Sequence, residues 1–213
     1  MSDISLEQPH TTEAHTAGAH GHGHHGAPSA TRIDNMKFAM WLFLASEVIL
    51  FTVLIVLFLI FRINHPEVVH EVHDATGVFL VALNTFLLLT SSWAMVMGLR
   101  EMKLGNRKGL INWIGLTAIL GTVFVALQGV EYSILASEGI GIYNSEFGMR
   151  FYAPTALHGM HVIAGVLWAL GVIVHAVRGG YAKDNVIGIE VFGLYWHFVD
   201  VVWIVLFTVI YLL

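Results

Sequence analysis

The chain contains no cysteine. This excludes disulfide bonds, zinc sites and iron–sulfur clusters held by thiolates, and the cysteine-bridged dinuclear copper centre. Only 12 % of the 213 residues are charged, and acidic residues outnumber lysine and arginine by 15 to 10. No basic patch is therefore large enough to bind a nucleic-acid backbone. Hydrophobic residues make up 56 % of the chain, a composition that is typical of an integral membrane protein.

The first 31 residues lack the early basic residue and the apolar core of a signal peptide. This segment is rich in glycine, alanine, threonine and histidine, and we expect residues 1–37 to form a disordered, His-rich cytoplasmic tail. The tail histidines could capture a divalent metal, but a soluble flexible tail is the favoured interpretation. They are His10, His15, His20, His22, His24 and His25.

Five apolar stretches are each long enough to cross a bilayer, which takes about 20 helical residues. Backbone groups in lipid must be hydrogen bonded within their own segment, so these stretches are predicted to be helices. We therefore expect an all-α bundle of five transmembrane helices that forms one domain over residues 38–213. The predicted spans are residues 38–61, 75–99, 110–136, 151–177 and 186–213.

The lysines and arginines are distributed unevenly over the two ends of these spans. The first and third loops hold only Arg62 and Arg150. By the positive-inside rule, the N-terminus is predicted to be cytoplasmic and the C-terminus outside. The basic residues assigned to the cytoplasmic side are Arg32, Lys37, Arg100, Lys103, Arg107, Lys108, Arg178 and Lys183.

Polar side chains inside the spans are functional candidates, because lipid disfavours them. A helix rises about 1.5 Å per residue, which places most of them in one layer at mid-membrane height. Glu131 is expected near the outer interface and Glu190 near the inner one. The mid-membrane residues are Glu47, Asn84, His161, His197 and Asp200, and the spans also contain Gln128, His158 and His175.

Two pairs of these residues are spaced three apart, so the members of each pair are expected on one helix face. His197 and Asp200 fit a neutral imidazole held by a carboxylate. His158 and His161 share a face of the fourth span, and Glu47 is expected to contact an imidazole across the bundle. Such groups either fix helix packing or handle protons or lipid, and haem ligation by histidines of facing helices also stays open.

Small residues within the third and fourth spans predict close approach of neighbouring helices. The glycines concerned are Gly115, Gly121, Gly159 and Gly165.

Five sequence motifs, in this order, resemble subunit III of the haem–copper oxidases, the cytochrome c and quinol oxidases. The first would place Glu47 as the membrane-embedded carboxylate of that family. The resemblance covers residues 38–213. The motifs are WLFLASEVILF (residues 41–51), LNTFLLLTSS (83–92), LQGVEY (127–132), HGMHVIAGVLW (158–168) and YWHFVDVVW (195–203).

Longer members of that family have two further helices, which form a V-shaped cleft that holds phospholipid. The present chain is similar to the five-helix bacterial form. The resemblance implies that this chain has no catalytic residue and binds no metal or redox cofactor, because haem and copper reside in subunit I. It also implies docking on subunit I, with subunit II, a small subunit IV, membrane lipids and a respiratory supercomplex as further partners.

The resemblance therefore predicts an accessory subunit of an aa3-type cytochrome c oxidase in a bacterial cytoplasmic membrane, which supports proton uptake and stabilises subunit I during oxygen reduction. Subunit III of a quinol oxidase is the alternative. From another class, a small haem b cytochrome using His161 and His197, or a proton-handling transporter, also remains. The residues expected to form a proton-related, lipid-related or buried polar network are Glu47, Asn84, Glu131, His158, His161, His197 and Asp200.

Overall fold

The computed structural model describes residues 30–65, 78–137 and 146–213. Within these ranges five helices are long and apolar enough to cross a membrane, which confirms the predicted all-α class and number of spans. The helices are α1 (Ala30–Asn64), α3 (Val78–Lys103), α4 (Arg107–Ser137), α5 (Glu146–Val177) and α6 (Ile187–Phe207). A π-helical turn, η1 (Thr208–Leu212), continues α6.

The first helix is longer than the apolar pattern predicts. It begins at Ala30, whereas the expected span begins at Phe38. A helix does not need to stop where its apolar residues stop, because its backbone remains hydrogen bonded in the polar interface. Residues 1–29 of the predicted tail, with all six of its histidines, lie outside the described residues.

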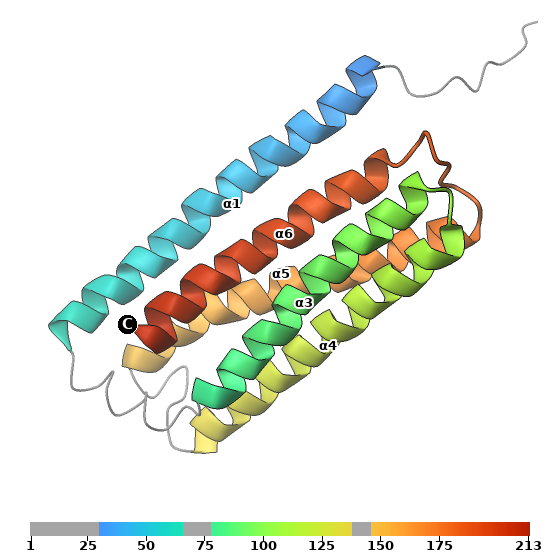
Figure 1. Ribbon diagram of the computed structural model, residues 1–213. Coiled ribbons are helices and arrows are strands. Elements are labelled where there is room, and N and C mark those ends of the chain that lie inside the picture. The colour runs from blue at the N-terminus through green and yellow to red at the C-terminus, as the bar shows by residue number, and fades with distance from the viewer. Residues whose placement is uncertain (1–29, 66–77, 138–145) are drawn as a thin grey trace, which may run out of the picture.

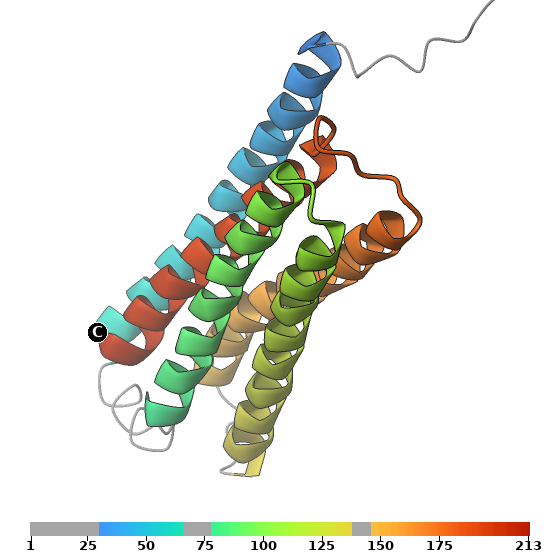
Figure 2. The ribbon, with the colours of Figure 1, turned by 45° about the vertical axis from the view of Figure 1, so that its right-hand side comes forward.

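The helices form a bundle of long, roughly aligned rods, in which α6 holds a central position (Figure 1). Helix α6 packs against α1, α3 and α5, while α3 packs mainly against α4 and α4 against α5. Helix α1 packs on α5 and α6 and lies at the edge of the bundle, as the second view shows (Figure 2). The start of α1 and the C-terminus lie at opposite ends of the bundle (Figure 1), as an odd number of spans requires.

Two tight turns close the bundle at the end where α1 begins. Between α3 and α4, Gly105 adopts a positive φ of 84°, a conformation that favours glycine. The side-chain Oδ1 of Asn106 then accepts a hydrogen bond from the backbone N–H of Gly109 at 3.0 Å and so caps α4. After α5, Gly179 adopts a φ of 83°. The first turn joins α3 directly to α4, whereas the second ends α5 ahead of the longer connection to α6.

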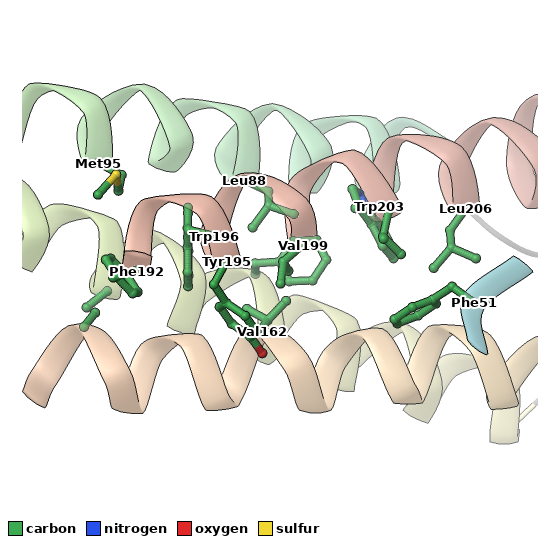
Figure 3. Packing of buried hydrophobic residues seen from close by; sticks show 14 of the residues in the cluster. Phe51, Leu88, Met95, Val162, Phe192, Tyr195, Trp196, Val199, Trp203 and Leu206 are labelled. Atoms are coloured by element: carbon green, nitrogen blue, oxygen red, sulfur yellow. The ribbon is translucent and has the colours of Figure 1, made fainter. Parts of the chain in front are cut away.

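The core is centred on large side chains of α6 that lie between α3 and α5 (Figure 3). Trp196 is 0 % exposed and Trp203 1 %. A Cβ atom at Gly165 would lie 2.6 Å from the Trp196 ring, and one at Gly121 2.7 Å from it. The predicted close approach is therefore confirmed at these two glycines.

The other two glycines of that prediction behave differently from each other. A Cβ atom at Gly159 would lie 2.8 Å from the side-chain oxygen of Gln128, so this position also permits a close contact between α4 and α5. A Cβ atom at Gly115 would meet nothing within 4 Å. The prediction is wrong at Gly115, where no described residue comes close to α4.

Candidate functional site: a buried polar layer

A carboxylate and an imidazole meet between α1 and α5. His161 Nε2 lies 3.2 Å from Glu47 Oε2, and the two side chains are 14 % and 18 % exposed. The ring of Phe51 packs edge-on against the imidazole, with 5.3 Å between the ring centroids. The Tyr195 hydroxyl donates a hydrogen bond to the His161 backbone carbonyl at 3.0 Å. The predicted contact of Glu47 with an imidazole is confirmed, and His161 is the partner.

The hydrogen bond of the second ring nitrogen of His161 indicates how many protons the Glu47–His161 pair carries. Nδ1 lies 2.8 Å from the Leu157 carbonyl oxygen, which can only accept, so Nδ1 carries a hydrogen atom. A favourable contact with Glu47 then needs one more proton, located on Nε2 or on the Glu47 carboxyl. With neither protonated, two acceptors would face each other in a site of low polarity. The geometry therefore fits a pair that shares one proton.

The predicted pairing of His197 with Asp200 is wrong. His197 Nδ1 instead pairs with the Ser92 hydroxyl of α3 at 2.6 Å. The Ser92 hydroxyl also faces Asp200, yet neither carboxylate oxygen of Asp200 has a hydrogen-bond partner among the described residues. Both side chains therefore lie toward Ser92 on α3, and the imidazole bonds to this hydroxyl in place of the carboxylate.

His158 and His161 both lie toward α6, where they stack on Trp203 and Tyr195 respectively, but their other neighbours differ. The His158 ring is 0 % exposed. It stacks on the Trp203 ring with 4.9 Å between ring centroids, and it lies edge-on to the Phe124 ring with 5.6 Å between centroids. The side chain of His161 instead contacts Glu47 on α1. Neither ring nitrogen of His158 has a hydrogen-bond partner within the described part of the chain. His158 therefore belongs to the aromatic core between α4 and α6.

Hydroxyl groups of α3 bind the buried polar atoms of α6. Trp196 Nε1 donates to Ser91 Oγ at 3.0 Å, and Trp203 Nε1 donates to Thr85 Oγ1 at 2.9 Å. The Asn84 side-chain amide donates to the Phe124 carbonyl oxygen on α4 at 3.2 Å. These contacts fix the rotation of α3 against α4 and α6.

A second polar group lies toward the far end of the bundle, where α1 ends. The Tyr211 hydroxyl donates to Glu131 Oε1 at 2.6 Å, and Glu131 is 5 % exposed. One turn away, the Gln128 amide donates to the Tyr132 hydroxyl at 3.0 Å, and this hydroxyl donates to Thr155 Oγ1 at 2.9 Å. The carboxylate of Glu131 is thus held by η1.

Glu190 lies at the opposite end, as its predicted position near the other interface requires. Each of its two carboxylate oxygens forms an ion pair with a lysine Nζ at 2.8 Å. One lysine is Lys37 on α1 and the other is Lys103 on α3. His175, also in the original set of polar span residues, packs edge-on against Tyr181 at 4.6 Å, beside the turn after α5. Both residues therefore belong to this end of the bundle and not to the central layer.

The geometry bears on cofactors as well. The described residues contain no group of three or more His, Asp or Glu side chains placed to hold a metal ion. Both ring nitrogens of His161 are engaged, and His197 points to Ser92 on α3. These two histidines therefore do not face each other across one pocket, as axial haem ligands would.

Sequence reasoning missed the hydroxyl residues of α3 and the Glu190 ion pairs. Serine and threonine are ordinary in apolar helices, where they commonly bond to a carbonyl of the preceding turn. Nothing in the motif around Ser91 and Ser92 indicates which neighbour they meet. The basic residues Lys37 and Lys103 entered only as topology signals, although their position opposite an acidic residue at the same interface is a usable indication.

The fold and its polar layer define a multi-pass helical membrane protein with an embedded carboxylate–imidazole pair. The family model described as cytochrome c oxidase subunit III matches residues 14–213. The chain therefore belongs to the cytochrome c oxidase subunit III family, and it is a subunit of a haem–copper oxidase complex, an oxidoreductase.

Curated relatives of two kinds resemble the chain. Cytochrome c oxidase subunit 3 of a Synechocystis strain is 38 % identical over 181 residues, which cover 84 % of this chain and 76 % of the relative. The protein of the same name from Bacillus sp. (strain PS3) is 36 % identical over 188 residues, covering 87 % and 89 %. Quinol oxidase subunit 3 of Bacillus spizizenii is 34 % identical over 178 residues, covering 81 % and 84 %.

Proposed function

We propose that this chain is an accessory subunit of an aa3-type cytochrome c oxidase and carries no redox centre of its own. In this role it stabilises subunit I and supports proton uptake during the reduction of oxygen to water. Haem and copper belong to the partner subunits, and the complex resides in a bacterial cytoplasmic membrane. Subunit I is the main contact, with subunit II and a small subunit IV beside it.

The observation that carries the proposal is the Glu47–His161 pair, whose geometry fits one shared proton at 3.2 Å. The pair lies between two membrane helices, where an ionisable group is costly unless it has a partner. A group that holds one proton and stays close to the bundle surface can exchange that proton with a neighbouring subunit. The side chains retain 14 % and 18 % exposure, so the pair is accessible at the edge of α1.

A quinol oxidase subunit III is the second candidate, because relatives of that name match the chain equally well. Identity is 34 % for the quinol oxidase subunit 3 of Bacillus spizizenii and 38 % for the cytochrome c oxidase subunit 3 of Synechocystis. These identities do not separate the two forms, and the proposal follows Glu47 and the YWHFVDVVW motif, which favour the cytochrome c form. The intact complex should oxidise reduced cytochrome c. Turnover with a reduced quinol alone would favour the second candidate.

Removal of the chain tests the accessory role. The purified complex should be reconstituted in vesicles with and without this subunit, and oxygen consumption and proton uptake followed over many turnovers. We expect oxygen reduction to continue at first without the subunit, but with slower proton uptake and earlier loss of activity. Unchanged proton uptake and lifetime would contradict the accessory role, as would immediate loss of the haem absorbance.

A further inference from the structure

Tyr195 on α6 lies where α1, α5 and α6 meet, and it is 4 % exposed. Its ring centroid lies 6.4 Å from that of Phe43 on α1 and 5.5 Å from that of Trp168 on α5. Phe43 precedes Glu47 by four residues, which is about one turn of the same helix. Tyr195 therefore contacts both of the helices that supply the Glu47–His161 pair.

The hydroxyl group of Tyr195 binds the backbone of α5 at His161. The side chain points from α6 toward α5 (Figure 3), and its hydroxyl donates to the His161 carbonyl oxygen at 3.0 Å. The planes of the two rings lie at 23° to each other, with 6.4 Å between the ring centroids. Tyr195 therefore restrains the backbone of His161 and limits the space in which the imidazole can move.

Helix α5 leaves room for this hydrogen bond at Gly165. In a regular helix a carbonyl oxygen accepts the N–H four residues further on, so the His161 carbonyl also faces the backbone of Gly165. A Cβ atom at Gly165 would lie 3.3 Å from Cε1 of Tyr195, which is shorter than the optimal separation of about 3.5–4.0 Å between carbon atoms. The missing side chain thus allows the phenol to approach the second lone pair of the carbonyl oxygen.

The hydrogen bond of the Tyr195 hydroxyl determines which role this side chain can have. A phenol has one hydrogen atom to donate, and in Tyr195 this atom is directed at the His161 carbonyl oxygen. The phenol also interacts electrostatically with Glu47, but it has no second hydrogen atom for that carboxylate. Tyr195 is therefore placed to orient the pair and not to carry its proton.

We propose that Tyr195 is a positioning residue whose hydroxyl fixes His161 on α5, so that Nε2 meets the Glu47 carboxylate and the two share one proton. The Leu157 carbonyl, 2.8 Å from Nδ1, sets the rotation of the imidazole, and Tyr195 sets the position of the backbone beneath it. The Nε2–Oε2 contact of 3.2 Å already exceeds the usual charge-assisted distance of about 2.7–2.9 Å, so a small displacement of His161 would break it. The inference rests on the proposed proton role of the pair.

The substitution Tyr195→Phe tests the proposal, because it deletes the hydroxyl and keeps the ring beside Phe43 and Trp168. Infrared difference spectra of the reconstituted complex over a range of pH should follow the Glu47 carboxyl band, which is identified by its loss in Glu47→Gln. One buried hydrogen bond changes the population of the arrangement that it favours by roughly two- to tenfold. We therefore expect a shifted or broadened Glu47 band, and proton uptake that is slower by at least about twofold.

Tyr132→Phe is the matched control. The Tyr132 hydroxyl also donates a hydrogen bond to α5, to Thr155 Oγ1 at 2.9 Å, but it lies toward the far end of the bundle. This variant should keep the Glu47 band and the rate of proton uptake of the unmodified complex. Assembly of each variant should be measured by co-purification of the other subunits, and failure of Tyr195→Phe to assemble would show that Tyr195 acts in packing and overturn the proposal.

A double variant separates this inference from the proposed function. If Tyr195 acts through the pair, Glu47→Gln/Tyr195→Phe should take up protons at the same rate as Glu47→Gln alone, because effects that act through one group do not add. Independent effects of the two substitutions would overturn the positioning role, as would an unchanged Glu47 band in Tyr195→Phe. If Glu47→Gln alone leaves proton uptake unchanged, the proposed function is wrong, and the Glu47 band in Tyr195→Phe still tests the position of His161.

Discussion

The side chain of Glu47 is the residue on which the proposed proton role depends most. In Glu47→Gln, the amide can still donate to the His161 Nε2, so the contact of 3.2 Å between α1 and α5 can persist. The shared proton is lost, however. We expect the variant to assemble into the complex and to show slower proton uptake, measured with a pH-sensitive dye in reconstituted vesicles.

A second substitution at Glu47 distinguishes the loss of the shared proton from the loss of the contact with His161. Glu47→Leu removes both, leaves the Nε2 atom of His161 without a partner, and should weaken assembly as well as proton uptake. If Glu47→Gln itself failed to enter the complex, Glu47 would act in packing. If it entered and took up protons at the normal rate, the proton role would be wrong.

The indole N–H of Trp203 makes a hydrogen bond, and the contribution of this bond to stability can be measured separately from the packing of the ring. Trp203→Phe deletes the bond of 2.9 Å to Thr85 but keeps an aromatic ring beside His158 and Phe124. A single buried hydrogen bond contributes about 0.5–1.5 kcal/mol, and polar contacts between membrane helices average about 0.6 kcal/mol. We expect a loss in this range in the unfolding free energy, from denaturation followed by circular dichroism.

Trp93→Phe is the control for that change. Trp93 is 54 % exposed, and its ring lies edge-on to Trp113 at 5.2 Å. The unfolding free energy should change less than in Trp203→Phe. Equal losses in the two variants would mean that aromatic area, and not the indole hydrogen bond, determines stability at Trp203.

Residue pairing was only partly predictable from the sequence. Glu47 and His161 could be matched because a buried carboxylate needs a partner at similar depth, and few candidates exist. His197 and Asp200 were wrongly paired because spacing along one helix does not show that a side chain of another helix, here Ser92 of α3, offers the imidazole a hydrogen bond. That depends on helix rotation, which packing of residues such as Trp196 decides.

The helices themselves were predictable, whereas their ends were not. A run of apolar residues long enough to cross a bilayer can only be helical there, and all five spans are present. The start of α1 at Ala30 could not be read from hydropathy, because a polar helical extension has the same composition as a loop. The predicted last span does reach residue 213, but hydropathy does not show that its end, η1, is π-helical, with the N–H of Leu213 donating to the Thr208 carbonyl at 3.0 Å.

The approach of α5 to α6 depends on a single missing side chain. Gly165→Ala would place its Cβ about 2.6 Å from the Trp196 ring, and overpacking of this kind costs about 1–3 kcal/mol. We expect a lower midpoint of thermal unfolding for the purified complex. Gly171→Ala lies on the same helix, and its Cβ meets nothing within 4 Å. It should leave the midpoint unchanged, and equal effects of the two substitutions would contradict this view of the helix contact.

The orientation of the whole molecule stays a prediction from its charges. Eight of the ten lysines and arginines lie at the N-terminal end of the bundle or in the second and fourth loops, which predicts that this end is cytoplasmic. Protease added to right-side-out vesicles should spare an epitope tag at the N-terminus and cut one at the C-terminus. The reverse pattern would overturn the orientation and place the ion pairs of Glu190 with Lys37 and Lys103 at the outer interface.

At the scale of the complex, the central claim is that the redox centres lie in other subunits. The most direct measurement is an optical spectrum of this chain and of the remaining complex after the two have been separated in detergent. The account predicts that the Soret band of the haems stays with the remaining subunits and is missing from this chain. A Soret band that stays with this chain would contradict the claim and favour a haem-binding cytochrome.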